Sequence, residues 1–409
     1  MAPFPLILTN LLGHYGAYLV YLLIGFAFGY VLEISGFGNS KKLAAQFYFK
    51  DMTVLKVMFT AIVVAMVLIF TATALGLLDY NLLYVNPTYL WPGIVGGLIM
   101  GIGFIIGGFC PGTSLVSAAT LKLDGIFFVL GVLFGIFLFG ESVDAFDVFW
   151  NSSYMGRLTI PDWLGASTGV VVLGVVLIAL FMFFGAEQLE RIVGKKDPKQ
   201  APKLRFVGAG VLVIVAVLLI FIGQPTNDDR WNRIAMEKEN LLAERAVQIQ
   251  PAELLYTMHD HKLNLVMLDV RDEIDYNLYH LADAKRVELD DIPTLIPGFH
   301  LEPANTVFVI MSNDEADATE AWKLLVAESI PNVYILEGGI NNWLATFGNE
   351  EEGIIALGEG DDEQLRYIFG AALGAAYSSA DPDPHEYELE YTPKIQLEMK
   401  RAPISGGCG

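Results

Sequence analysis

The sequence predicts an α-helical integral membrane domain followed by a soluble α/β domain. Residues 1–223 contain about six apolar windows, and each is long enough to cross a bilayer at roughly 20 residues. After residue 248, strand-like and helix-like segments alternate, which is typical of a small domain built on a parallel sheet. We expect the membrane helices to form a parallel internal repeat. The apolar windows are 15–34, 54–78, 91–109, 125–141, 163–184 and 206–223.

The charge divides at the same place as the hydropathy. Residues 1–223 carry 12 Lys and Arg against 11 Asp and Glu, and residues 224–409 carry 13 against 35. The net charges of +1 and −22 account for the −21 of the whole chain. The acidity therefore belongs to the soluble part, and it argues against nucleic acid or anionic lipid as that part's partner.

Within residues 1–223, the loops on one side of the membrane hold all the basic residues but one. The loops on the other side hold only Arg157. Because basic loops face the cytoplasm, we expect both termini and the soluble part to be extracytoplasmic, in a bacterial inner membrane. A re-entrant segment would reverse that side. The start of the chain has no basic region, which predicts no cleavable signal peptide. The basic set comprises Lys41, Lys42, Lys50, Lys56, Lys122, Arg191, Lys195, Lys196, Lys199, Lys203 and Arg205.

A cysteine in a run of small residues interrupts the third apolar window: Gly107-Gly108-Phe109-Cys110-Pro111-Gly112-Thr113-Ser114. Pro111 lacks an amide donor and Gly112 permits unusual dihedral angles, so a helix is expected to break here. Broken backbone at membrane depth is tolerated only where protein buries it or a cavity hydrates it. Either Thr113 and Ser114 satisfy the freed backbone groups, or their hydroxyls face a polar solute. Cys110 is either a contact for that solute or a small buried hydrophobe.

The same pattern occurs around Gly36, which predicts the repeat. From Gly36 to Asp51 is 15 positions, and from Gly108 to Asp124 is 16. Both stretches join two apolar windows and run from the outside to the inside and back, so the repeat is parallel, as in transporters that bind a solute near the midplane. The alternative is that helices rich in Gly and Phe look alike by chance. Gly38 stands where the second unit has Cys110.

Stretches 36–44, 50–58 and 107–114 resemble the YeeE/YedE family of sulfur-compound transport proteins, within a similarity that spans roughly 15–145. The resemblance implies transport of thiosulfate or a related small sulfur anion, which a membrane-embedded cysteine contacts. This membrane part is short for the family and has one embedded cysteine, which implies a homo-oligomer or partner membrane subunits. The substrate-binding residues implied are Gly108, Cys110, Pro111, Gly112, Thr113 and Ser114.

The soluble part resembles the rhodanese domain over about 100 residues, through Asp269-Val270-Arg271, Asp275-Tyr276, His280-Leu281 and Gly338-Gly339 with Trp343. The resemblance places a catalytic cysteine at the position of Ser312, after the strand 308–311. A serine hydroxyl forms no persulfide, and it is hardly ionised at neutral pH without a base. The acids Asp314, Glu315 and Asp317 are expected to repel an anionic sulfur donor. We therefore predict a pseudoenzyme domain and a protein that is no enzyme, with no catalytic residues, cofactor or metal.

Four segments are expected: a transmembrane domain at 1–223, a linker helix at 224–247, a rhodanese-like domain at 248–347 and an acidic extension at 348–409. Within the extension, 363–379 reads as helix and 387–399 as two strands. Cys408 is either a swinging sulfur carrier or an incidental thiol of a flexible tail. The predicted function is transport of the sulfur anion across lipid, without nucleic acid. The alternative is an accessory or scaffolding subunit of a larger membrane complex.

Overall fold

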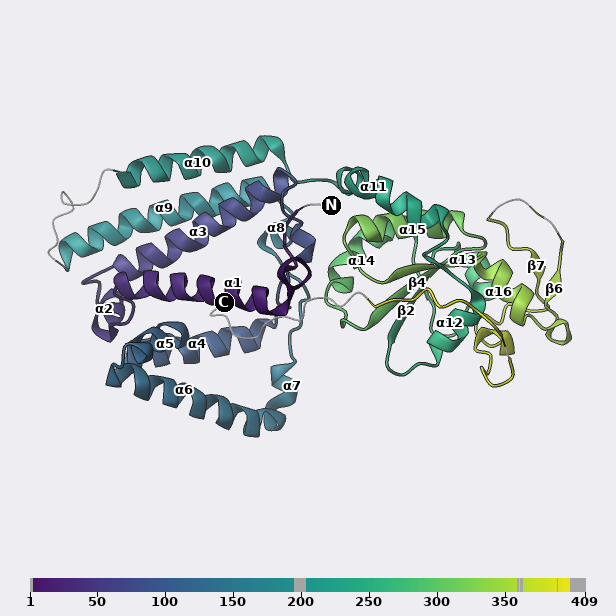
Figure 1. Ribbon diagram of the computed structural model, residues 1–409, viewed down its shortest axis with the longest axis horizontal. Helices are drawn as coiled ribbons and strands as arrows, with labels where there is room; N and C mark the ends of the chain where they lie inside the picture. The colour runs from purple at the N-terminus through teal and green to yellow at the C-terminus, as the bar shows by residue number, and fades with distance from the viewer. Residues whose placement is uncertain (1–2, 195–203, 359, 361–362, 388, 398–409) are drawn as a thin grey trace. The chain divides into compact units, whose positions relative to one another are not determined.

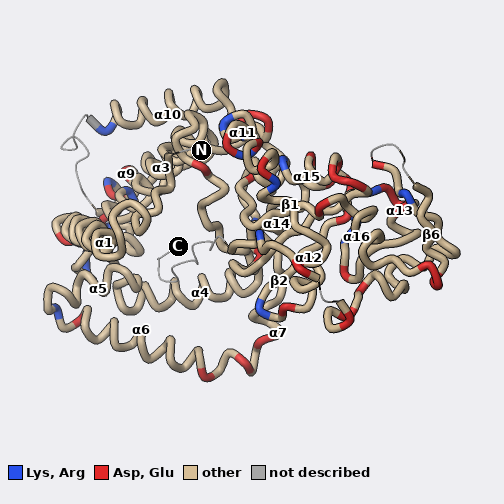
Figure 2. Tube along the Cα trace, turned by 45° about the vertical axis from the view of Figure 1, so that its right-hand side comes forward, with Lys and Arg blue, Asp and Glu red and all other residues tan. Residues whose placement is uncertain are grey.

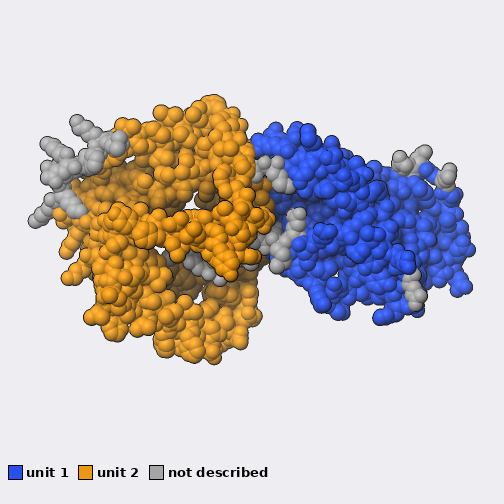
Figure 3. All heavy atoms as spheres, viewed as in Figure 1, with its two compact units in different colours: residues 1, 225–403 blue, residues 2–224, 404–409 orange. Residues whose placement is uncertain are grey.

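The computed structural model describes residues 3–194, 204–358, 360, 363–387 and 389–397 (Figure 1). These residues form two compact units, which are coloured separately in Figure 3. The first unit lies within residues 2–224 and the second within residues 225–403.

Within the described residues, six helical segments of the first unit are long and apolar enough to span a membrane, which confirms the prediction. Between 6% and 33% of each candidate span is buried inside the protein, so most of its apolar surface faces outward, as in helices bathed in lipid. The long helices are α1 (Leu8–Ile34), α3 (Thr53–Ala74), α4 (Leu90–Gly107), α6 (Leu123–Ser142), α9 (Thr168–Ile192) and α10 (Leu204–Ile222).

The first unit uses one order of elements twice: a long helix, a sharp turn, a short helix and a second long helix. Gly36 (φ +80°) and Gly108 (φ +73°) make the two turns, in a backbone conformation that glycine adopts without steric cost. The residues that follow them, Phe37 and Phe109, are both buried in one apolar cluster. The two halves therefore meet at their turns. The short helical segments are α2 (Ser40–Ala44), η1 (Ala45–Tyr48) and α5 (Pro111–Ala119).

A second cluster joins α3, α9 and α10, whose facing surfaces are lined by small and β-branched side chains such as Val67, Val176 and Ala216. Gly169 of α9 lies against the backbone of α10, where a Cβ would meet Ile220 at 2.8 Å. Close approach of this kind is how membrane helices gain packing energy. Short segments complete the unit: η2 (Tyr80–Leu82), η3 (Val143–Phe146), α7 (Asp147–Trp150) and α8 (Ile160–Leu164).

Basic residues of the first unit gather at the end of the bundle where α1 and α9 end and α3, α6 and α10 begin (Figure 2). One ion pair at this end joins the ammonium of Lys122 to the carboxylate of Glu33 at 3.2 Å. Another joins Lys56 to Glu190 at 2.6 Å, and the buried Glu190 also accepts from the amide of Met52. Lys195, Lys196, Lys199 and Lys203 lie outside the described residues.

The second unit is built on a five-stranded parallel sheet of order β1-β5-β4-β2-β3, so the predicted α/β domain is confirmed. The long central strands are apolar on both faces because helices cover both. Trp343 is buried in the cluster on one face and Trp322 in the cluster on the other. The strands are β1 (Gln248–Ile249), β2 (Asn264–Asp269), β3 (Lys285–Arg286), β4 (Thr306–Met311) and β5 (Val333–Leu336).

Helix α11 (Asn227–Ala243) lies in the stretch 224–247, for which a linker helix is predicted, and it belongs to this compact unit. Its Trp231 meets Trp322 edge to face, with ring centroids 6.3 Å apart, and Arg230 pairs with Glu328. Trp322 belongs to α15 (Ala316–Ala327). The other helices and turns are α12 (Pro251–Met258), α13 (Glu273–Leu278), η5 (Leu289–Asp291), α14 (Ile292–Phe299), α16 (Gly339–Phe347) and η6 (Glu350–Glu352).

The helix expected over residues 363–379 is wrong. This stretch contains β7 (Tyr367–Ile368), which pairs with β6 (Ile355–Ala356), and the turn η7 (Ser378–Ala380). Gly370 and Gly374 disfavour a helix, and Tyr377 is buried in the domain core instead.

The two strands expected over residues 387–399 are absent from the described part of that stretch. The amides of Lys394 and Ile395 bond there to the buried carboxylate of Glu253, at 2.7 and 2.8 Å, in place of a neighbouring strand. The extension thus folds back onto the α/β domain.

Candidate functional site

Cys110 sits at the point where α4 gives way to α5. Helix α4 ends at Gly107, Gly108 adopts the left-handed conformation, and Pro111 is the first residue of α5. The expected helix break is therefore present, and Pro111 starts the new helix, where its missing amide donor costs nothing. Cys110 is the N-cap residue of α5 and is half-buried.

The thiol of Cys110 takes part in a capping box with Thr113. Its sulfur accepts from the amide of Thr113 at 3.5 Å, and the Thr113 hydroxyl accepts from the amide of Cys110 at 3.0 Å. The sulfur also lies 3.2 Å from the Thr113 hydroxyl oxygen, and the hydroxyl of Ser114 donates to the carbonyl of Pro111. Both hydroxyls thus satisfy the helix end, which is the first of the two roles that the sequence left open.

The turn of the first half lies against the turn that contains Cys110. A Cβ built on Gly108 would meet the backbone oxygen of Ser40 at 3.0 Å. The hydroxyl of Ser40 donates to Asp124 at 2.8 Å, and the ammonium of Lys122 donates to the carbonyl of Gly38 at 3.0 Å. The six residues predicted for the sulfur anion therefore lie in one elbow, and Gly108 of this elbow packs against Ser40 of the other half.

The second candidate site is the loop 312–317, between β4 and α15. Ser312 is fully buried at the end of β4, and the loop leads into the first turn of α15. The amides of Ile340 and Asn341, in the first turn of α16, donate to the carbonyls of Ser312 and Asn313 at 2.9 and 3.0 Å. A Cβ on Gly339 would lie 2.2–2.5 Å from three loop carbonyl oxygens, so glycine is required there.

A buried ion pair between Asp269 and Arg271 contacts this loop through Asn313. Arg271 donates to both carboxylate oxygens of Asp269, at 2.9 and 2.6 Å, and to the carbonyl of Tyr279 at 2.7 Å. Both side chains are at most 1% exposed. A remaining guanidinium nitrogen lies 3.4 Å from the side-chain oxygen of Asn313. The Asp-Val-Arg motif therefore holds the loop, which is a structural role.

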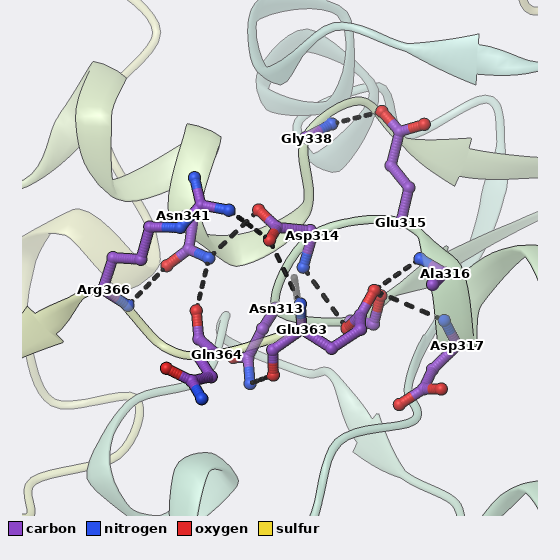
Figure 4. A network of polar contacts seen from close by, with 11 residues as sticks. Asn313, Asp314, Glu315, Ala316, Asp317, Gly338, Asn341, Glu363, Gln364 and Arg366 are labelled. Atoms are coloured by element: carbon purple, nitrogen blue, oxygen red, sulfur yellow. Dashed lines mark hydrogen bonds and ion pairs between the residues drawn. The ribbon is translucent and has the colours of Figure 1, made fainter. Parts of the chain in front are cut away.

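Residues far along the chain complete the loop site, as Figure 4 shows. Glu363 of the extension points its carboxylate into the loop and accepts from Ser312 and from loop amides. Arg366 pairs with Asp314 at 2.5 Å. Arg245, which precedes β1, forms a bidentate ion pair with Glu315 of the loop, at 2.7 and 2.8 Å.

These arginines alter the electrostatic expectation for the loop. The sequence predicts repulsion of anions by Asp314 and Glu315, yet each carboxylate faces a guanidinium from outside the loop. The local negative charge is therefore smaller than the sequence of the loop suggests. Sequence reasoning missed Glu363, Arg366 and Arg245 because no motif links them to a loop that lies 46 to 70 positions away.

Both units of the chain match known protein families. Residues 35–228 match the family model described as sulphur transport, and residues 250–346 match the rhodanese-like domain. The chain thus joins a sulphur transport domain of the YeeE/YedE type to a rhodanese-like domain, as the two resemblances implied.

Two proteins are similar to part of this chain. The thiosulfate sulfurtransferase GlpE of Pseudomonas fluorescens is 29% identical over 85 residues, which is 21% of this chain and 75% of that protein. A full-length protein of solved structure from Lactobacillus plantarum is 22% identical, with a TM-score of 0.23, and covers 27% of this chain and 93% of its own.

Proposed function

We propose that this protein carries thiosulfate or a related small sulfur anion across the bacterial inner membrane, with Cys110 in contact with the anion. The observation that carries the proposal is the position of the thiol, at a helix break inside the sulphur transport domain and only half-buried. Broken backbone of this kind is tolerated at membrane depth only where it is enclosed or faces a hydrated cavity.

The elbow offers chemistry that suits a sulfur anion. A thiol is a weak hydrogen-bond donor and a polarizable contact for sulfur. Helix α5 starts at this point, and the positive end of a helix favours a nearby anion. Gly108, Pro111, Gly112, Thr113 and Ser114 shape the elbow through the turn and the capping box, and we assign them to the same site.

Uptake of labelled thiosulfate in cells tests the role of Cys110. The Cys110→Ala variant is expected to lose at least about tenfold in uptake, while the matched thiol control Cys408→Ala keeps it. Immunoblotting of membranes confirms that both variants insert. Uptake by Cys110→Ala at the wild-type rate would remove Cys110 from the path.

The rhodanese-like domain is proposed to be a non-catalytic binding or adaptor module. Ser312 occupies the position from which a persulfide would form, and its hydroxyl accepts from the amide of Ala318 at 3.3 Å. The hydroxyl of Ser312 donates to the carboxylate of Glu363 at 3.2 Å, but a serine oxygen cannot form a persulfide whatever its partner. A cyanide-dependent sulfurtransferase assay of the full chain is expected to show no turnover; turnover that Ser312→Ala abolishes would overturn this assignment.

The second candidate is an accessory or scaffolding subunit without transport activity. The membrane helices bury little of their surface inside the chain, which leaves apolar faces that either lipid or partner membrane subunits can cover. Reconstitution separates the two functions. Thiosulfate entry into proteoliposomes that contain the purified chain alone supports transport, whereas stable co-purifying subunits and no entry support the scaffold.

A further inference from the structure

The carboxylate of Glu363 fills the loop that follows β4. One oxygen accepts from the hydroxyl of Ser312 at 3.2 Å and from the amides of Ala316 and Asp317, the latter at 3.4 Å. The other oxygen lies 3.4 Å from the amide of Asp314. Donors from the loop and from the first turn of α15 therefore converge on one anionic group, in the geometry by which helix N-termini bind anions.

The backbone that carries Glu363 is fixed by separate contacts, so its side chain is aimed into the loop. Asn341 donates to the carbonyl of Gln364 at 2.8 Å and accepts from the amide of Arg366 at 2.8 Å. Asn313 donates to the carbonyl of Glu363 at 3.1 Å, and the amide of Glu363 donates to Asp314 at 3.2 Å. We call residues 363–366 the strap.

The strap also changes the charge around the loop. Arg366 comes with it and pairs with Asp314 at 2.5 Å, with both side chains partly buried. Without that pair, Asp314 and Glu363 would place two carboxylates beside one another, which is unfavourable. The strap thus places the carboxylate of Glu363 against the loop amides. It also places the guanidinium of Arg366 against Asp314, the acid that would otherwise repel the carboxylate of Glu363.

We propose that the loop is a working oxyanion cradle that the chain keeps closed with its own carboxylate, Glu363, so that small sulfur oxyanions have no access while the strap is in place. The proposal is independent of transport through the membrane domain. It assigns to the extension the role of an internal occupant of the rhodanese-like domain.

The test introduces a thiol at the bottom of the cradle of the full-length purified protein. Three variants are compared: Ser312→Cys, Ser312→Cys with Glu363→Ala, and Ser312→Cys with Glu351→Ala. Glu351 is the matched control, since it lies in the same extension but not in the strap. Iodoacetamide alkylation of the introduced thiol is followed by peptide mass spectrometry, which separates it from Cys110 and Cys408. We expect alkylation at least tenfold faster in the Glu363→Ala variant than in the other two.

Thiosulfate and sulfate then report on anion binding. At millimolar concentrations, either anion is expected to slow alkylation in the Glu363→Ala background and to leave the Glu351→Ala background unchanged. Equal alkylation rates in all three variants would overturn the closure. If alkylation is faster in the Glu363→Ala variant but neither anion slows it, the strap only covers Ser312. That result would overturn the claim that the loop binds oxyanions. Should Glu363→Ala lose its native circular dichroism, Glu363→Ser, which also empties the loop, is measured with the same readout and the same expectations.

Discussion

Lys122 joins the two halves of the membrane unit, because its ammonium lies 3.2 Å from a carboxylate oxygen of Glu33 and 3.0 Å from the carbonyl of Gly38. Glu33 belongs to the last turn of α1, and Lys122 is the N-cap residue of α6. A contact between the end of α1 in one half and the start of α6 in the other restrains the angle between the two helices. The elbow with Cys110 precedes Lys122 in the second half, and the short helix α5 separates the two.

The coupling between Lys122 and Glu33 is expected to be small but measurable. Each side chain is about 40% exposed, and partly exposed pairs of this kind contribute about 0.5 kcal/mol. A double-mutant cycle with Lys122→Met and Glu33→Gln isolates this value. Thermal unfolding in a Cys408→Ala background, followed by a dye that reacts with the thiol of Cys110, is the readout. Lys41→Met is the control, and a coupling no larger than that between Lys41 and Glu33 would contradict the tether.

Removing the cap of α5 is expected to loosen the elbow. Thr113→Val deletes the hydroxyl that accepts from the amide of Cys110, and loss of an N-terminal capping bond costs about 1 kcal/mol. Thr113→Ser keeps the hydroxyl and should keep the stability. The same thermal measurement compares them; a valine variant as stable as the serine variant would show that the capping box does not hold the elbow.

Much of the fold follows from the sequence because its signals are local. The apolar windows give the six long helices, and the apolar runs at β2, β4 and β5 give the centre of the sheet. The turn around Cys110 follows from Pro111 and from glycine.

The contacts at the cradle do not follow from local signals. Glu363 reaches Ser312 across 51 positions, and it lies in the segment 363–379, for which the sequence pattern wrongly predicts a helix. Its conformation is set by Asn341 and by the core around Tyr377, and these contacts exist only in the folded domain. Long-range polar contacts of this kind leave no periodic trace in a sequence.

Breaking the ion pair under the cradle is expected to destabilise the α/β domain strongly. Asp269→Asn leaves the guanidinium of Arg271 buried without its counter-charge, which costs about 3–5 kcal/mol. Denaturant unfolding of the full chain, followed by the fluorescence of the buried tryptophans, measures the loss. The pair of Arg286 with the exposed Glu288 is the control, because Glu288→Gln should cost less than about 0.5 kcal/mol. A similar loss in both variants would contradict the structural role of Asp269.

The side of the membrane on which the soluble unit lies can be read from Cys408. The described lysines and arginines at one end of the bundle predict that this end is cytoplasmic and that the chain beyond α10 is outside. Cys408 lies outside the described residues, yet it is a chemical handle. A membrane-impermeant maleimide should label it in intact spheroplasts, with Cys408→Ala as the control. Labelling only after permeabilisation would place the soluble unit in the cytoplasm.

Ionisation of the buried phenol of Tyr279 is expected to lower the free energy of unfolding of the α/β domain in alkaline solution. Its ring is fully buried, its hydroxyl donates to the carbonyl of Ser379 at 2.9 Å, and burial raises the pKa of the phenol well above its usual value of 10.0. A raised pKa means that folding favours the protonated form, so this contribution to stability is complete below pH 10 and is lost as pH rises through the pKa of the folded state. The loss per titrating group approaches about 1.4 kcal/mol for each pH unit above 10.

Denaturant unfolding between pH 8 and pH 11 measures this dependence in the wild type and in Tyr279→Phe. The phenylalanine variant is expected to be less stable by about 1 kcal/mol at pH 8, because it leaves the carbonyl of Ser379 without this donor. Its decline above pH 10 should nevertheless be shallower, so the two curves converge as the pH rises. Tyr391→Phe is the comparison, since this less deeply buried phenol also has a raised pKa but should change the slope less. Parallel curves for the wild type and Tyr279→Phe would show that Tyr279 does not carry the alkaline transition.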